Sequence, residues 1–187
     1  MSIAGIDYSL KSPAICIFMG NSRAEFKFSN CLFFYLTDVK KNARSFGKNI
    51  TGELFSSYNE ECERYDSISE WACDKVVGCN QVALEGYAYN AKGASAFQLA
   101  ENMGILKYKI FEMSLPLDVV TPTEVKKFAT TKGNADKEQM HFSFTKETKV
   151  NMHNKITPDK SGVGNPVSDI VDAYFICRWM HSKMNAL

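Results

Sequence analysis

The sequence predicts an α/β protein built on one mixed β-sheet, and two patterns support this fold class. Near the N-terminus, three apolar runs follow one another with only short turns between them, which is typical of an antiparallel meander. From residue 59 onward, segments with helical periodicity alternate with short apolar strands. We therefore expect a five-stranded sheet, with a three-stranded antiparallel meander and two parallel strands, flanked by helices on both faces.

The meander is expected to use residues 3–7, 14–19 and 25–36 as its strands. A Lys11-Ser12-Pro13 turn signal separates the first two runs, and the third is rich in Phe and Tyr, which favour strands. Residues 37–58 are polar and show no clear period, so a loop is expected there. Its lysines and arginine fit two interpretations: contacts with phosphates, or an ordinary solvated surface.

The second half of the chain is expected to alternate between helix and strand. Helices are predicted at residues 59–77, 94–113 and 122–129, from 136 to 144, and from 168 onward, with strands at 81–84 and 116–120. Thr121 and Ser168 are predicted to cap the helices that follow them. Because 187 residues suit one domain and no internal repeat divides them, we expect residues 1–187 to form a single domain.

Composition excludes several classes of protein. No run of 18 apolar residues is present, so no membrane span is expected, and the N-terminus lacks the pattern of a signal peptide. The six cysteines form no CxxC pair and are interpreted as reduced thiols of an intracellular protein. The net charge of +1 hides a basic region at 122–160 and an acidic one at 53–74. Such clustering suits phosphate contacts, although a lysine-rich solvated surface fits it too.

Four acids occupy positions where they could act together. Asp7 and Glu85 each end an apolar strand, and ligands gather at the carboxyl ends of strands in an open α/β sheet. Asp169 and Asp172 stand three residues apart at the start of the last helix, so they share a face. Taken singly, each fits a turn or a helix-start charge. Taken together, carboxylates without histidine favour Mg²⁺ or Mn²⁺, and paired ions of this kind cut phosphodiesters.

Five segments then carry a family resemblance. The three acid-bearing segments are Gly5-Ile6-Asp7, Ala83-Leu84-Glu85 and residues 165–173, and two lysine-bearing segments, 121–127 and 133–140, lie between them. In this order they resemble the RuvC family of Holliday-junction resolvases, within the RNase H-like superfamily. The resemblance covers nearly the whole chain.

The resemblance implies a metal-dependent endodeoxyribonuclease with two Mg²⁺ ions per site, for which Mn²⁺ can substitute. It implies a homodimer that nicks opposed strands of a four-way DNA junction and leaves 5′-phosphate and 3′-hydroxyl ends, with no nucleotide cofactor and no membrane partner. We expect the dimer to form through the helix at 94–113, whose apolar surface exceeds one stripe. The resemblance assigns four metal ligands and two basic catalytic residues: Asp7, Glu85, Asp169, Asp172, Lys126 and Lys137.

The sequence also departs from the family pattern. Tyr8-Ser9 follow Asp7 where bacterial members usually have Pro-Gly. After Glu85, residues 86–92 replace a segment whose aromatic side chain pries at the junction centre, and either Tyr87 or Tyr89 is predicted to stack on a base there. These departures are typical of a divergent, phage-type member, acting in the cytoplasm of a bacterial or phage-infected cell. Further DNA contacts are predicted for Lys92, Lys127 and Lys132.

Two other functions stay open at this point. One is a different nuclease of the same fold, acting on RNA–DNA hybrids or flaps. The other is an inert module that binds branched DNA, against which the complete set of acids argues. A nucleotide-binding kinase or ATPase is excluded because the chain is too short for a two-domain architecture and has no GxxxxGK[ST] loop.

Overall fold

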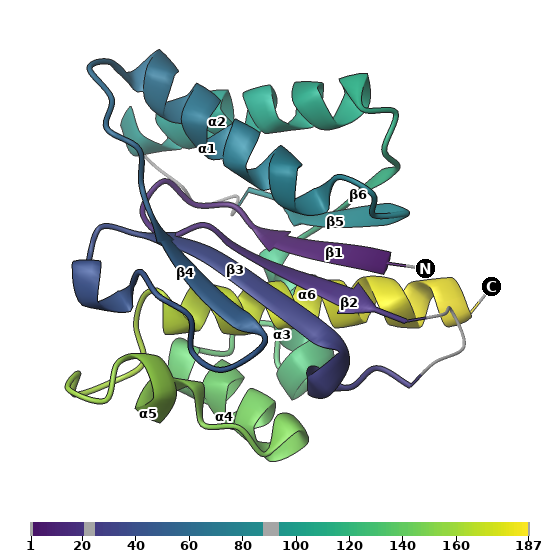
Figure 1. Ribbon diagram of the computed structural model, residues 1–187. Helices are drawn as coiled ribbons and strands as arrows, with labels where there is room; N and C mark the ends of the chain where they lie inside the picture. The colour runs from purple at the N-terminus through teal and green to yellow at the C-terminus, as the bar shows by residue number, and fades with distance from the viewer. Residues whose placement is uncertain (1, 21–24, 88–93, 187) are drawn as a thin grey trace.

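The computed structural model describes residues 2–20, 25–87 and 94–186, and along them a mixed sheet lies between two layers of helices (Figure 1). Two helices cover one face of the sheet: α1 (Glu61–Val76) and α2 (Ala94–Glu112). The other face carries α3 (Pro122–Thr130), α4 (Lys137–Thr148), α5 (Met152–Ile156) and α6 (Val167–Asn185). Each face has its own hydrophobic core. None of the helices in these ranges could span a membrane.

The sheet has six strands in the order β4-β3-β2-β1-β5-β6, so the expected α/β class is confirmed and the expected count of five is wrong. The antiparallel meander and the two parallel strands of the prediction are all present. The additional strand, β4, pairs in parallel with β3. The strands are β1 (Ser2–Asp7), β2 (Ala14–Met19), β3 (Cys31–Thr37), β4 (Ile50–Leu54), β5 (Gln81–Glu85) and β6 (Leu117–Val120).

Strand β4 lies inside the region that was expected to be a loop. The sequence did not predict this strand because Gly52 stands at its centre, and glycine is rare within strands. The structure gives the reason for this glycine: a Cβ atom there would overlap the Asn42 carbonyl oxygen and the Tyr35 ring. The third predicted strand is also shorter than expected, because a 3-10 helix at Phe28–Asn30 precedes β3.

Helix starts agree with the prediction at Thr121 and differ at Ser168. Thr121 caps α3 through a reciprocal pair of bonds with Glu124, in which each residue's backbone N–H donates to the other's side chain. Helix α6 begins at Val167 after Pro166, and no side chain caps it. The Ser168 hydroxyl is engaged instead with the acidic site described below. Helix α5, only five residues long, was not predicted.

The close approach of α6 to β1 positions the functional site, and Gly5 permits it. A Cβ atom at Gly5 would overlap the Cys177 amide nitrogen and lie 2.6 Å from the Ala173 carbonyl oxygen. The helix backbone therefore rests on the strand backbone without a side chain between them. As a result, the first turn of α6 is held at the end of β1, where Asp7 stands.

Replacement of Gly5 by alanine should destabilise the fold by about 1–3 kcal/mol or more, because the added methyl group forces α6 away from β1. Urea unfolding measures the change. Gly164→Ala is the matched control, since nothing lies within 4 Å of the added Cβ there. Equal stabilities of the two variants would contradict the role assigned to Gly5.

Candidate active site at the edge of the sheet

The acids of three separate elements gather at one edge of the sheet. Strands β1 and β5 are parallel neighbours, with Ile6 paired to Leu84, so Asp7 and Glu85 leave the sheet side by side. Asp169 and Asp172 lie in the first two turns of α6, which packs on β1. In Figure 1 this edge is on the left, where α6 begins.

Burial and mutual repulsion define the electrostatics of the four acids. Asp7 is 9% exposed and Asp169 7%, while Glu85 and Asp172 are half-buried. Burial raises the pKa of Asp7 well above its usual value, and the charges of the other three acids raise it further. Burial, with a smaller contribution from Asp172, raises the pKa of Glu85 to about 8. Burial and the charge of Asp169 raise the pKa of Asp172 to about 7.

Both lysines that the resemblance singled out face these acids. The Lys137 ammonium donates to Asn165 Oδ1 at 3.0 Å and lies 3.3 Å from the Ser168 hydroxyl. Burial dominates the raised pKa values of the acids, and the charge of Lys137 opposes that rise at Asp7. The charge of Lys126 does the same at Glu85. The site thus pairs a set of carboxylates with two cations.

A hydrogen-bond network that the sequence analysis missed orients Asp169. The Ser12 hydroxyl, in the turn between β1 and β2, donates to Asp169 Oδ2. Asn165 Nδ2 donates to the Ser12 hydroxyl at 2.7 Å, and the Ser168 hydroxyl lies 3.1 Å from Asp169 Oδ1. Ser12 is buried, so this contact is enclosed. Only the position of Ser12 in the sequence could have pointed to this role, because the turn that holds it follows the strand that ends at Asp7.

The four acids are close enough to shift one another's pKa, but they are not arranged around a single point. Within the described ranges, no three or more His, Cys, Asp or Glu side chains stand where together they could hold a metal ion. Both Asp169 oxygens face serine hydroxyls in this arrangement. The expectation that all four share a pair of ions therefore stays a prediction.

The predicted DNA-contact residues lie in different places. Tyr87 is 38% exposed, and its hydroxyl donates to the Ala100 carbonyl of α2 at 3.3 Å, so the ring lies along that helix. The Lys107 ammonium lies 5.1 Å from the centre of the Tyr87 ring and adds a cation that the sequence analysis missed. Lys127 and Lys132 are exposed on α3 and the turn after it. Tyr89 and Lys92 lie outside the described residues.

Tyr8, which departs from the family pattern, is a buried residue. Its hydroxyl donates to Asn102 Oδ1 at 3.1 Å, and Asn102 is fully buried in α2. Burial raises the pKa of the Tyr8 hydroxyl. The residue after Asp7 is therefore joined to the helix on the opposite side of the sheet from α6.

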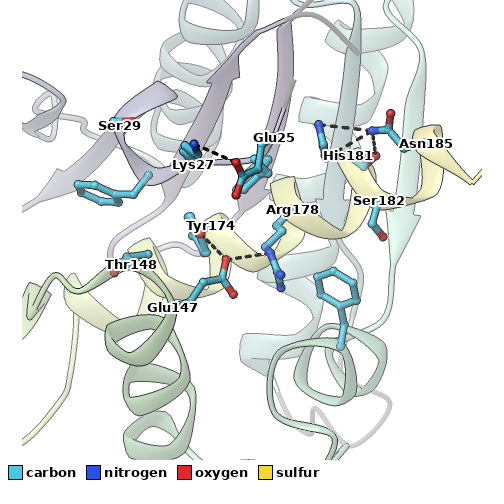
Figure 2. Close-up of a pocket in the computed structure, with 13 residues that line it drawn as sticks. Glu25, Lys27, Ser29, Glu147, Thr148, Tyr174, Arg178, His181, Ser182 and Asn185 are labelled. Atoms are coloured by element: carbon cyan, nitrogen blue, oxygen red, sulfur yellow. Dashed lines mark hydrogen bonds and ion pairs between the residues drawn. The ribbon is translucent and has the colours of Figure 1, made fainter. Parts of the chain in front are cut away.

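A hollow of about 1030 Å³ lies along the C-terminal half of α6, away from the four acids of the candidate site (Figure 2). It is lined by a network of structural contacts. There, Glu147 of α4 accepts a hydrogen bond from the Tyr174 hydroxyl at 2.6 Å and pairs with Arg178 Nε at 2.8 Å. Each of these polar side chains thus has a partner, and the contacts join α4 to α6. They keep α4, and Lys137 at its start, in place.

The arrangement of helices and strands is similar to that of solved resolvase structures. A Thermus thermophilus RuvC structure matches with a TM-score of 0.60 at 18% identity, covering 100% of this chain and 95% of that one. The same organism's RuvC in complex with a Holliday junction substrate matches with a TM-score of 0.62 at 16% identity, covering 100% and 94%. A Fowlpox virus resolvase with substrate Holliday junction DNA matches with a TM-score of 0.56 at 17% identity, covering 98% and 99%. At these low identities, the TM-scores show a shared fold and nothing more specific.

The sequence comparisons go further. The family model for crossover junction endodeoxyribonuclease RuvC matches residues 63–163, a range that includes Glu85, Lys126 and Lys137. A curated crossover junction endodeoxyribonuclease RuvC from Campylobacter concisus is 37% identical over 153 residues, which span 81% of this chain and 84% of that protein. The chain therefore belongs to the RuvC family of crossover junction endodeoxyribonucleases.

Proposed function

We propose that this protein is a metal-dependent, structure-selective DNA endonuclease that resolves four-way junctions by nicking opposed strands. One observation carries the proposal: four carboxylates and two lysines from distant parts of the chain meet at one edge of the sheet. Family membership supports the reaction, since the curated relative is named a crossover junction endodeoxyribonuclease. A structural relative is described in complex with a Holliday junction, which supports the substrate.

The chemistry of the donor set suits hard divalent cations, although among the described residues no three of these acids converge on one point. Asp7, Glu85, Asp169 and Asp172 offer carboxylate oxygens, which suit Mg²⁺ or Mn²⁺ better than zinc. Burial of several like charges raises their pKa values, and a cation between them would remove that repulsion. We assign these acids as ligands of two Mg²⁺ ions, for which Mn²⁺ can substitute. When bound, such ions supply an activated water and stabilise the leaving 3′ oxygen.

The remaining polar residues hold the carboxylates and meet the phosphate. Ser12, itself held by Asn165, fixes the orientation of Asp169, as hydrogen bonds behind a metal ligand generally do. Lys126 and Lys137 place positive charge where the scissile phosphate gains negative charge in the transition state. Attack on the phosphorus with departure of the 3′ oxygen leaves 5′-phosphate and 3′-hydroxyl ends. The whole chain would act as one nuclease domain, and the bacterial relative supports a cytoplasmic site of action.

The outer face of α2 supports a homodimer. Phe97, Tyr108 and Phe111 are 73%, 60% and 77% exposed. They and Gly104 follow a spacing of seven, four and three residues, which is the spacing of a helix seam. Nothing lies within 4 Å of a Cβ built at Gly104, so a second helix could approach closely there. Paired nicking of a junction needs two active sites, and two copies joined through α2 would supply them.

Substitution of Asp7 by asparagine should lower cleavage of a synthetic four-way junction about 10³-fold or more while leaving junction binding intact, because the loss of one proposed metal ligand would remove several kcal/mol of charge stabilisation. Ser12→Ala should lower activity about 10–100-fold through misorientation of Asp169. Ser182→Ala, at the far end of α6, is the control. Gel-based cleavage assays measure all three.

The same assay separates the alternative substrates. A junction, a flap and an RNA–DNA hybrid of equal length are compared with the unmodified protein. Faster cleavage of the hybrid would show that the four-way junction is not the preferred substrate. Unchanged activity of Asp7→Asn would contradict the assignment of Asp7 as a metal ligand.

Without a bound cation, the free energy of unfolding should fall as the pH rises from about 4.5 to about 8, because the pKa of Glu85 is about 8 when folded against 4.5 normally. The folded chain binds this proton more tightly than the unfolded chain, so stability present at low pH is lost through that window. Asp172, with a pKa of about 7, adds the same trend. Urea unfolding in a chelator, with Glu85→Gln/Asp172→Asn expected to flatten the curve, checks the sign.

Addition of Mg²⁺ should raise Tm more at pH 8 than at pH 5, since the ligands are charged mainly at the higher pH. An equal rise in the Glu85→Gln/Asp172→Asn variant would place the ion elsewhere.

A charge on the outer face of α2 should separate the dimer. Phe97→Glu/Phe111→Glu is expected to give a monomer in light scattering and to convert paired nicking into single nicks. Phe142→Glu is the matched control, because Phe142 is 68% exposed on α4, away from the proposed seam. A stable dimer in the double variant would contradict the assignment of α2.

A further inference from the structure

The connection between β3 and β4, residues 38–49, is a basic surface that the proposed catalytic roles do not use. Its exposed charged side chains are those of Lys40, Lys41, Arg44 and Lys48 against one acid, Asp38. It lies outside the segment that the family model matches, 63–163. It leads into β4, the strand that the expected architecture lacked. The match to the family model therefore does not extend to this surface.

The backbone of this connection is held firmly in place. The Tyr35 hydroxyl donates to the Asn42 carbonyl at 2.6 Å, and the Gly52 N–H donates to the Arg44 carbonyl at 3.0 Å. Phe46 is buried and packs in the core on the α6 side of the sheet. The cations thus project from a fixed scaffold, so a ligand that binds them need not order a loop.

Contacts join the connection to the candidate active site. Lys41 forms an ion pair with Asp159 at 2.9 Å, in the loop that precedes α6. In the same loop, Lys160 donates to the Asn165 carbonyl at 2.8 Å, and Asn165 holds Ser12. A hollow of about 600 Å³ lies between these parts and is lined by Lys11, Ser12, Asp38, Val39, Lys160 and Asn165, among others.

The chemistry of the exposed side chains selects the partner. The one aromatic residue within residues 38–49, Phe46, is buried, so these residues themselves offer charge without a stacking platform, while the exposed Tyr58 lines the adjacent hollow. Binding of single strands relies on stacking of bases on aromatic side chains. Double-stranded DNA, whose bases are already stacked, is bound through its closely spaced phosphates by lysine and arginine.

We propose that residues 38–49 bind the phosphate backbone of a duplex DNA arm as that arm leaves the active site. The inference rests on the proposed function and adds to it the surface that holds one arm of the substrate. It assigns Lys40, Arg44 and Lys48 as phosphate contacts. Lys41 serves mainly to join the connection to the loop before α6 through Asp159.

The test is the salt dependence of binding to a four-way junction, measured in a chelator so that no cutting occurs. In Lys40→Gln/Arg44→Gln/Lys48→Gln, the slope of log affinity against log salt should become shallower by about 3, roughly one for each lost phosphate contact. Binding at any one salt concentration should weaken. The cleavage rate at saturating junction and the rise of Tm with Mg²⁺ should stay unchanged.

Lys27→Gln/Lys146→Gln/Lys149→Gln is the matched control, since it removes the same charge from exposed lysines near the C-terminal end of α4. It should retain the original slope, and equal slopes in the two triple variants would overturn the inference.

A second probe is a single strand of equal length. Its binding should weaken less than the binding of duplex DNA in the Lys40→Gln/Arg44→Gln/Lys48→Gln variant, and an equal loss of affinity would overturn the choice of partner. An unmodified protein that binds junctions without cutting them refutes the proposed nuclease while the slopes still decide this inference. Failure to bind either DNA refutes both.

Discussion

The backbone contact between Gly5 and α6 is the constraint on which the rest of the site depends. It sets a helix directly against a strand, and the Cys177 thiol adds a hydrogen bond to the Ile3 carbonyl at 3.3 Å. Asp169 therefore approaches Asp7 from a rigid element rather than from a loop. Functional groups held on helices and strands keep their geometry better than groups on loops, which suits a reaction that depends on placement.

The same contact brings like charges together, and the surrounding residues balance them in two ways. Lys126 and Lys137 oppose the repulsion with positive charge, and the Ser12 hydroxyl donates to the most buried carboxylate on α6. Even so, the acids retain raised pKa values, with burial as the main cause. Stability and occupancy of the site are thereby linked, because whatever neutralises the acids also stabilises the fold.

Patterns within short segments predicted much of this arrangement, and contacts across long distances explain what they missed. Asp7 and Glu85 could be placed because each ends an apolar run, and parallel pairing brings such ends together. Ser12 could not be assigned, since its partner, Asp169, lies 157 residues away. Strand β4 could not be predicted, because the close approach of Asn42 and Tyr35 that requires glycine at position 52 is visible only in the folded chain. Lys126 and Lys137 were recognised only through the family resemblance.

The hydrogen bond from Tyr8 to Asn102 has a consequence for the assembly as a whole. It links the strand that carries Asp7 to α2, the helix through which two copies are proposed to join. The path from Asp7 to the proposed dimer seam then runs through the adjacent residue, Tyr8, one buried hydrogen bond and one helix. Two active sites connected through the proposed seam would stand at a constant separation, and the junction would have to present its opposed strands at that same spacing.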